Sequence, residues 1–276
     1  MENDLEKMIK LASKIRIHVL DMVHYAQSSH IGASYSIVEI LVTLYSRILK
    51  INPKDPSEID RDKFILSKAH GSCALYAILA ESTFFPLELL KKYYVDGGVL
   101  PGHLDKKSVP GIEHSMGSLG HGLPFGVGLA YANKIDQNKG QIYVLIGDGE
   151  CNEGTIWESA MFAGHHKLDN LTVIVDYNKI QSFGRVDEVM SLEPFGEKWT
   201  SFNWEVHEID GHNFEQLITA FESESTKPKV IIANTIKGKG VSFMEDKLEW
   251  HYKSPNSEQY NEALKELENK TREVLL

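Results

Sequence analysis

Two polar residues in the sequence follow apolar stretches and together could hold a divalent cation. Asp148 lies between two glycines after the apolar stretch 142–146, and Asn178 follows the apolar stretch 171–177. A carboxylate, an amide oxygen and a main-chain carbonyl from the turn after Asn178 are hard oxygen donors of the kind that Mg²⁺ and Ca²⁺ prefer. The flanking glycines have no side chain, so a bulky anion could approach the backbone closely. We therefore predict a diphosphate anchored by a metal ion.

A β-α-β unit would bring these two residues together. Both apolar stretches are rich in β-branched residues, and an amphipathic segment separates them. Parallel strands joined by a crossover end at the same edge of the sheet, where open α/β sheets bind ligands. A Gly-Asp-Gly alone is a weak signal, because such tripeptides also form loops with a solvated aspartate. The second strand favours the binding site over the loop.

The rest of the chain alternates between helical and strand-like patterns. We expect helices over 5–26, 37–48, 72–81, 87–94, 123–135, 213–222 and 261–276, and further strands over 62–67, 204–209 and 229–235. This alternation predicts an α/β fold with a mostly parallel sheet and helices on both faces.

Several local features refine this picture. Ser34 is a candidate cap for the helix 37–48. Gly126 and Gly128 are two helix positions at which backbones could pack closely. The glycine-rich segment 97–122 is too long for an ordinary connection, and its moderate apolar content favours an ordered, functional loop.

Composition limits the class of protein. With 276 residues, 42% hydrophobic and 25% charged, the chain is long enough for one sizeable α/β domain. A net charge of −10 argues against nucleic acid as the main partner. Cys73 and Cys151 form no disulfide framework or ligand spacing. Because no signal-like start, membrane-spanning run or lipidation motif is visible, we expect a cytoplasmic protein without a membrane partner.

Histidines are the second group of residues that could take part in catalysis or binding. His30 lies in a turn between two predicted helices, and His70 lies between a predicted strand and the start of a helix, a position that favours anions. A histidine chosen at random is more often an ordinary hydrogen-bonding residue. We keep that interpretation for His18, His24, His165, His166, His207 and His212. For His30, His70, His103 and His251 the surrounding sequence motifs favour a functional role instead.

Several separated motifs, taken in order, resemble the N-terminal part of transketolase over nearly the whole chain. They are Ser29-His-Ile-Gly32, Leu66-Ser-Lys-Ala-His-Gly71, Pro101-Gly-His103, Gly117-Ser-Leu-Gly120, Gly147-Asp-Gly149 with Glu153-Gly154, Asp176-Tyr-Asn-Lys-Ile180, Lys237-Gly-Lys-Gly-Val241 and Trp250-His251. Each motif is weak alone, but the combination is specific.

The resemblance implies a thiamine diphosphate-binding fold and a set of binding residues. It implies that Mg²⁺ is held by Asp148, Asn178 and the carbonyl of Ile180. It places near thiamine diphosphate the residues His70, Gly117, Leu119, Asp148, Gly149, Asp176, Asn178, Lys237 and His251. Within that set, Gly117 and Leu119 belong to the aminopyrimidine, and Asp176 helps to place the cofactor or the donor. Lys237 has the alternative of being a solvated loop lysine.

The resemblance also implies an activity. A transketolase moves a two-carbon ketol unit from a ketose or its phosphate to an aldose or its phosphate. His30 and His103 would face the reacting hydroxyls, with His70 and His251 near them. Histidine suits this role because its pKa lies close to neutrality.

A full-length transketolase continues into a pyrimidine-binding domain and a C-terminal domain, and neither is expected in this chain. We therefore expect residues 1–276 to be a single diphosphate-binding domain. The hypothesis is an N-terminal subunit of a split transketolase, inactive alone and completed by a separate C-terminal subunit, in an α2β2 assembly that acts on sugars or sugar phosphates.

The sequence departs from the family pattern on the substrate side. His121 replaces a usual glutamine, His114 enters a stretch of small residues, and Ile31 replaces a frequent proline. The pentose phosphate pathway and the synthesis of a specialised sugar therefore both remain open. Alternative functions are the thiamine-binding subunit of a 2-oxo acid dehydrogenase, a deoxyxylulose-phosphate synthase and a non-catalytic binding module. A nucleotide-binding Rossmann domain is disfavoured because no Gly-x-Gly-x-x-Gly follows a first strand.

Overall fold

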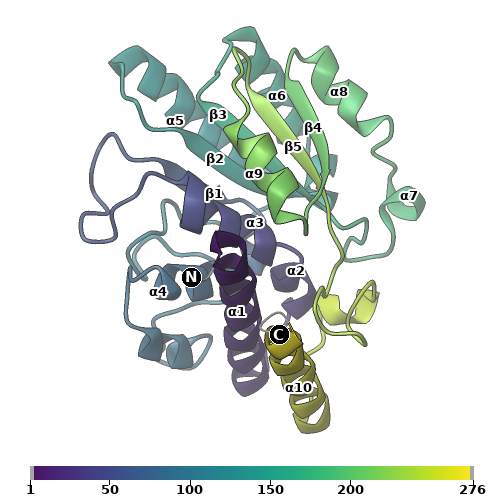
Figure 1. Cartoon of the computed structure of the whole chain (residues 1–276). Coiled ribbons are helices and arrows are strands. Elements are labelled where there is room, and N and C mark those ends of the chain that lie inside the picture. Colours follow the sequence, from purple (N-terminus) through teal and green to yellow (C-terminus); the bar gives the residue numbers. More distant parts are fainter. Residues whose placement is uncertain (1–2, 274–276) are drawn as a thin grey trace.

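The computed structural model of the chain describes residues 3–273 and shows a five-stranded sheet with helices on both faces (Figure 1). All neighbouring strands pair in parallel, in the order β1-β2-β3-β5-β4. The strands are β1 (Lys63–Leu66), β2 (Ile142–Gly147), β3 (Leu171–Tyr177), β4 (Glu205–Asp210) and β5 (Lys229–Asn234). The predicted α/β class and each predicted strand are confirmed.

The helices connect these strands. The α-helices are α1 (Asp4–Ala26), α2 (Ile31–Tyr35), α3 (Val38–Thr43), α4 (Ser72–Glu81), α5 (Gly122–Asp136), α6 (Gly154–His165), α7 (Val186–Val189), α8 (Phe195–Ser201), α9 (Phe214–Glu222) and α10 (Ser257–Glu273). Short π or 3₁₀ turns are η1 (Leu44–Ile48), η2 (Ala69–Gly71), η3 (Leu87–Lys92), η4 (Gly149–Asn152) and η5 (Leu248–His251). The segments α7 and α8 were not predicted. Residues 274–276 of the predicted tail helix lie outside the described residues.

Burial along the strands follows their place in the sheet. Every residue of the central β2 is buried, whereas β4 at the edge is partly exposed along its whole length. Helices cover both faces of a central parallel strand, so its side chains must be apolar throughout. In Figure 1, α5 and α6 lie behind the sheet and α9 lies in front of it. The carboxyl ends of the central strands are therefore held by a rigid, fully buried core.

The long helix α1 adds an outer layer. Asn3 and Glu6 form a capping box at its start, which satisfies backbone N–H groups that would otherwise lack partners. Its apolar stripe is buried, as predicted from the spacing of its hydrophobic residues. The helix packs between α4 and the C-terminal α10 (Figure 1). The two ends of the chain thus share one layer beside the sheet.

Two local predictions were wrong. Ser34 lies inside α2 and is fully buried, while α3 begins after Ile37, so Ser34 does not cap the next helix. Gly126 does allow close packing, because an added Cβ would lie 2.4 Å from Cγ2 of Val144. A Cβ at Gly128 would meet nothing within 4 Å. Two residues along an α-helix turn the side chain by about 200°, so only one of these glycines can face the sheet.

One apolar stretch has the length of a membrane span. Residues 31–48, in α2, α3 and η1, are the only such candidate in the part of the chain that the structure describes, and 78% of this stretch is buried inside the protein. Its apolar character is explained by its place in the core beside α1 and α9.

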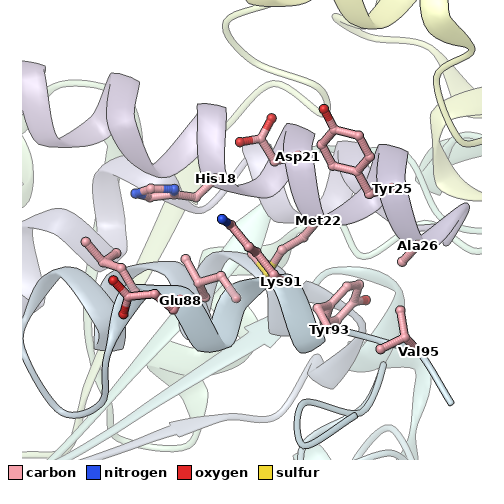
Figure 2. Close-up of a pocket in the computed structure, with 11 residues that line it drawn as sticks. His18, Asp21, Met22, Tyr25, Ala26, Glu88, Lys91, Tyr93 and Val95 are labelled. Atoms are coloured by element: carbon pink, nitrogen blue, oxygen red, sulfur yellow. The ribbon is translucent and has the colours of Figure 1, made fainter. Parts of the chain in front are cut away.

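A groove lies between α1 and η3, away from the strand ends (Figure 2). Its volume is about 680 Å³. Asp21 and Tyr25 project from α1 above it, while Lys91 and Tyr93 rise from the opposite wall. None of the residues that the sequence singles out as catalytic, cofactor-binding or metal-binding lines this groove.

Candidate active site

The carboxyl ends of β2 and β3 lie side by side at one edge of the sheet. Gly147 of β2 pairs with Asp176 of β3. The turns that follow are joined directly, because the backbone N–H of Lys179 donates to Oδ2 of Asp148 at 2.6 Å. The predicted proximity of these two strand ends is confirmed.

A pocket of about 480 Å³ opens at this edge. It draws its walls from the strand ends, the start of α2, the irregular segment before α5 and the region of η5. The residues predicted from the sequence that line it are His30, His70, His103, Gly117, Leu119, Asp148, Gly149, Asn178, Ile180, Lys237 and His251. The fold thus brings the predicted residues into one cavity, with the single exception of Asp176.

Asp176 lies behind the pocket wall and is fully buried. Its carboxylate accepts hydrogen bonds from Ser36 Oγ at 2.7 Å and Asn178 Nδ2 at 2.9 Å, and also from Lys68 Nζ and Thr235 Oγ1. Burial alone would raise the pKa of Asp176, but Lys68 and the other donors hold it below its usual value. Asp176 therefore positions Lys68 and Asn178, and its role in placing the cofactor or the donor stays a prediction.

Four histidines surround one end of the pocket. The ring centroid of His30 lies 5.4 Å from that of His70, 6.2 Å from that of His103 and 5.1 Å from that of His251. His30 has a left-handed backbone, with φ of 72°, and precedes α2. Its backbone N–H donates to the carbonyl of His251 at 2.9 Å. Residues separated by more than two hundred positions are thus tied together by the main chain.

Three of these imidazoles are held in the neutral form. Burial lowers the pKa of His30 to about 4 and that of His251 to about 3, and neighbouring positive charges add to the effect. Burial, followed by the charge of Lys68, places the pKa of His70 well below its usual value. At neutral pH these three imidazoles therefore contribute no positive charge to the pocket.

Lys68 and Lys237 are the buried lysines of the wall, each 1% exposed. Lys237 Nζ donates to the carbonyl of Ile180 at 2.8 Å and lies 2.8 Å from Nδ1 of His251. Burial, with the charge of Lys68, lowers the pKa of Lys237 to about 8, so its ammonium form still predominates at pH 7. An ammonium can only donate, so Nδ1 of His251 accepts and the neutral ring carries its proton on Nε2. Two buried lysines thus place positive charge in the pocket wall of a protein with a net charge of −10.

The oxygen donors fit a hard divalent cation. Asp148 is buried, and burial followed by the charge of Asp176 raises its pKa to about 6. A cation beside this carboxylate would offset both effects. Asn178 Oδ1 accepts from the N–H of Ile180 at 3.1 Å, which orients its oxygen, and amide and carbonyl oxygens each have a second lone pair. Among the described residues no three or more His, Cys, Asp and Glu form a metal-binding group, so a zinc-type site is not indicated.

Glycines leave the pocket open to a bulky ligand. An added Cβ at Gly117 would have its nearest neighbour, His103, at 3.9 Å, and one at Gly147 would meet Lys68 at 3.9 Å. Either Cβ would therefore occupy free space in the cavity rather than clash with the protein. This arrangement suits a ligand that approaches the backbone closely.

Several pocket residues were missed by the sequence reasoning. Lys68 lies within a recognised motif and Glu150 follows Gly-Asp-Gly, so both positions had a signal. Gln181, Phe183 and Tyr252 had none. Phe183 and Tyr252 are 83% and 61% exposed at the mouth of the pocket. Their exposure gives the polar cavity an apolar rim.

The residues that depart from the family pattern do not line the pocket. His114 stacks on Phe125 with 4.0 Å between ring centroids and an interplanar angle of 15°. His121 is exposed, with Nδ1 3.1 Å from the carbonyl oxygen of Leu119. Neither histidine lines the pocket, and Ile31 is fully buried. Their influence on the choice of sugar stays a prediction.

Comparison with known proteins gives a consistent match. Residues 7–269 match the family described as "Transketolase, thiamine diphosphate binding domain". The chain is 45% identical over 260 residues to a 6-deoxy-6-sulfo-D-fructose transketolase subunit of Clostridium sp., covering 93% of this chain and 94% of that protein. It is 44% identical over 269 residues to an apulose-4-phosphate transketolase subunit of Actinobacillus succinogenes, with 97% of each chain covered.

Longer relatives match over only part of their length. Human transketolase is 34% identical over 91% of this chain, but the match covers 40% of the human protein. The crystal structure of Campylobacter jejuni transketolase superimposes with a TM-score of 0.90 at 31% identity, covering 99% of this chain and 46% of that chain. The chain thus spans more than nine-tenths of the length of the subunit relatives and less than half of these transketolases.

Proposed function

The chain belongs to the transketolase family through its thiamine diphosphate-binding domain, and on that premise we propose that it is the N-terminal subunit of a two-subunit transketolase. Its relatives of equal length are named as transketolase subunits, while full-length transketolases are more than twice as long. The observation that carries the proposal is the pocket, in which buried lysines, neutral imidazoles and oxygen donors converge at the carboxyl edge of the sheet.

Thiamine diphosphate is the cofactor that we propose for this pocket. Lys68 and Lys237 supply positive charge for its phosphates, and the proton on Nε2 of His251 supplies a neutral donor. His70 and the backbone of Gly149 would lie along the diphosphate, and Gly117 and Leu119 along the aminopyrimidine. When bound, this cofactor supplies the carbon nucleophile that allows a two-carbon ketol unit to pass from a ketose to an aldose.

Mg²⁺ is the metal ion that we propose. Asp148, Asn178 and the carbonyl of Ile180 would hold it, leaving the other coordination positions to phosphate and water oxygens. Asp176 supports this set by fixing the amide of Asn178 from behind.

His30 and His103 are the residues that we propose for proton transfer at the substrate hydroxyls. Nδ1 of His30 lies 2.8 Å from Ser29 Oγ, so Nε2 is the atom with which His30 would exchange a proton. Its low pKa keeps the ring neutral at neutral pH, and in the tautomer whose Nδ1–H donates to Ser29 Oγ the free Nε2 can act as a base. His103 faces it across the pocket, and His70 and His251 complete the ring of imidazoles.

We further propose that residues 1–276 form one diphosphate-binding domain and that the pyrimidine-binding and C-terminal domains belong to a separate subunit. The expected assembly is α2β2, in the cytoplasm. The exposed Phe183 and Tyr252 at the pocket mouth support a partner that covers this site.

The names of the relatives favour a specialised sugar as donor. One relative is named for a ketose with a sulfonate group and another for a ketose phosphate. We therefore propose a ketose with a terminal anionic group as the donor of this enzyme.

The test of the function has two steps. Calorimetry should first show that this chain binds thiamine diphosphate only when Mg²⁺ is present. Mixing it with the protein encoded by an adjacent reading frame should then produce ketol transfer from a ketose phosphate to an aldose phosphate. Pyruvate-dependent reduction of an acceptor in the same mixture would favour a 2-oxo acid dehydrogenase. Cofactor binding without activity for any pyrimidine-domain partner would favour a non-catalytic module.

A further inference from the structure

Glu150 is a buried carboxylate to which the proposed function gives no role. It follows Gly-Asp-Gly in η4 and is 2% exposed. Oε1 accepts from the backbone N–H of Gly120 at 2.8 Å and from the hydroxyl of Ser67, and Oε2 accepts from the N–H of Gly147 at 3.1 Å. A buried charge is retained only where its hydrogen bonds are satisfied, and this carboxylate accepts three.

These bonds join three separate parts of the pocket wall. Ser67 follows β1, Gly147 ends β2 and Gly120 belongs to the segment that precedes α5. Ser67 extends the link, because its Oγ accepts from the N–H of Gly122 at 3.0 Å. The segment 117–122, which carries the pocket residues Gly117 and Leu119, is thereby fastened to two strand ends.

The segment 117–122 depends on these bonds more than the strands do. The end of β2 is also held by the sheet, where the N–H of Asp148 donates to the carbonyl of Asp176 at 3.3 Å. The segment does not pair with β1 or β2. Apart from the bonds to Glu150 and Ser67, the carbonyl of Gly120 accepts a hydrogen bond from Thr155 Oγ1 at 2.8 Å. Loss of the carboxylate should therefore release the segment before it disturbs the strands.

Close packing also restricts the backbone of the segment. Gly120 has φ of +83°, and an added Cβ there would lie 2.6 Å from Thr155 Oγ1. A Cβ at Gly122 would lie 2.3 Å from Ser67 Oγ. The backbone is therefore seated directly against the side chains that hold it.

We propose that Glu150 is a positioning residue that holds the segment 117–122 against the strand ends, so that Leu119 stands at the pocket wall where the organic part of the cofactor would bind. This inference rests on the proposed function for the identity of the ligand, but the contact between Glu150 and the segment does not depend on it.

The test uses Glu150→Ala and Ser67→Ala in the full chain, with the exposed Glu262→Ala of α10 as a matched control. Hydrogen exchange of the segment 117–122, measured without ligand, should become at least about tenfold faster in both variants and stay unchanged in the control. In Ser67→Ala the hydrogen bond from the N–H of Gly147 to Glu150 remains. This variant therefore tests the attachment of the segment without removing the bond to the end of β2. Glu150→Gln, whose one oxygen can replace Oε1, should restore most of the protection.

Calorimetry with Mg²⁺ then compares thiamine diphosphate with inorganic pyrophosphate. In Ser67→Ala and Glu150→Ala the affinity for thiamine diphosphate should fall by about tenfold to a hundredfold, as expected when a bond to a charged acceptor is lost, while pyrophosphate binding stays nearly constant. Unchanged exchange, or equal losses for both ligands, would overturn the proposal. Should the wild type bind neither ligand, the proposed function fails, whereas the exchange data still decide whether Glu150 holds the segment.

Discussion

Acid should destabilise this protein through His30, and the variant His30→Asn tests this. The pKa of His30 is lowered from 6.5 to about 4 in the folded state, first by burial and then by nearby positive charge. Between those two values the unfolded chain binds the proton and the folded chain does not, so folding stability must fall as the pH falls. Asparagine removes the titration and tolerates the left-handed backbone with φ of 72° that His30 adopts.

The magnitude follows from linkage. A histidine with a pKa of 6.5 when unfolded and about 4 when folded contributes about 1.8 kcal/mol less stability at pH 5 than at pH 7. His30 is partly exposed, so solvent screening reduces the expected contribution to about 1 kcal/mol. The wild type should therefore lose about 1 kcal/mol more than His30→Asn over this pH range, whatever constant offset the substitution adds.

Urea denaturation at pH 7, 6 and 5 measures this difference, with the exposed His165→Asn as the matched control. The control should retain the wild-type pH dependence. Saturating inorganic pyrophosphate with Mg²⁺ should reduce the difference, because an anion beside His30 raises its pKa. Parallel pH curves for wild type and His30→Asn would refute the reasoning, since they would mean that His30 is protonated equally in both states and that burial and nearby positive charge do not lower its pKa.

Three further substitutions probe other parts of the site. Asp148→Ala should abolish Mg²⁺-dependent binding of thiamine diphosphate in calorimetry, and retained binding would rule out the metal site. In the assembled enzyme His103→Ala should lower kcat by far more than it lowers cofactor affinity, whereas equal losses would contradict a role at the substrate. Asp176→Asn should destabilise the protein by about 3 kcal/mol or more in urea denaturation, because it leaves Lys68 charged and buried without its partner; a change below about 1 kcal/mol would mean that this ion pair is dispensable.

Local patterns in the sequence determined the strands and most of the longer helices of this fold. The apolar stretches 142–146 and 171–177 predicted adjacent parallel strands, and the stripe in α1 predicted its buried face, because periodicity and propensity act over a few residues. The sequence also predicted that the turns after these two strands lie close together, because parallel strands joined by a crossover end at the same edge of the sheet. The error at Gly128 arose because the face that packs on the sheet depends on neighbours distant in the chain, and the error at Ser34 arose because this residue lies inside α2, a helix that the sequence pattern did not predict.

The family motifs also identified half of the residues that line the pocket, although not their hydrogen-bond partners or protonation states. That Asp176 is enclosed behind the wall, that Lys68 pairs with it and that Glu150 fastens a distant segment all depend on side chains from several elements meeting in three dimensions. The same applies to the neutral imidazole of His30, because its pKa depends on burial and on charges far away in the sequence. The sequence by itself therefore determined that β2 and β3 pair and which residue types gather at their ends. Only the tertiary structure decided which of these residues line the pocket and which lie buried behind its wall. The reason is that desolvation and hydrogen bonding depend on packed neighbours from the whole fold and not on the local chain.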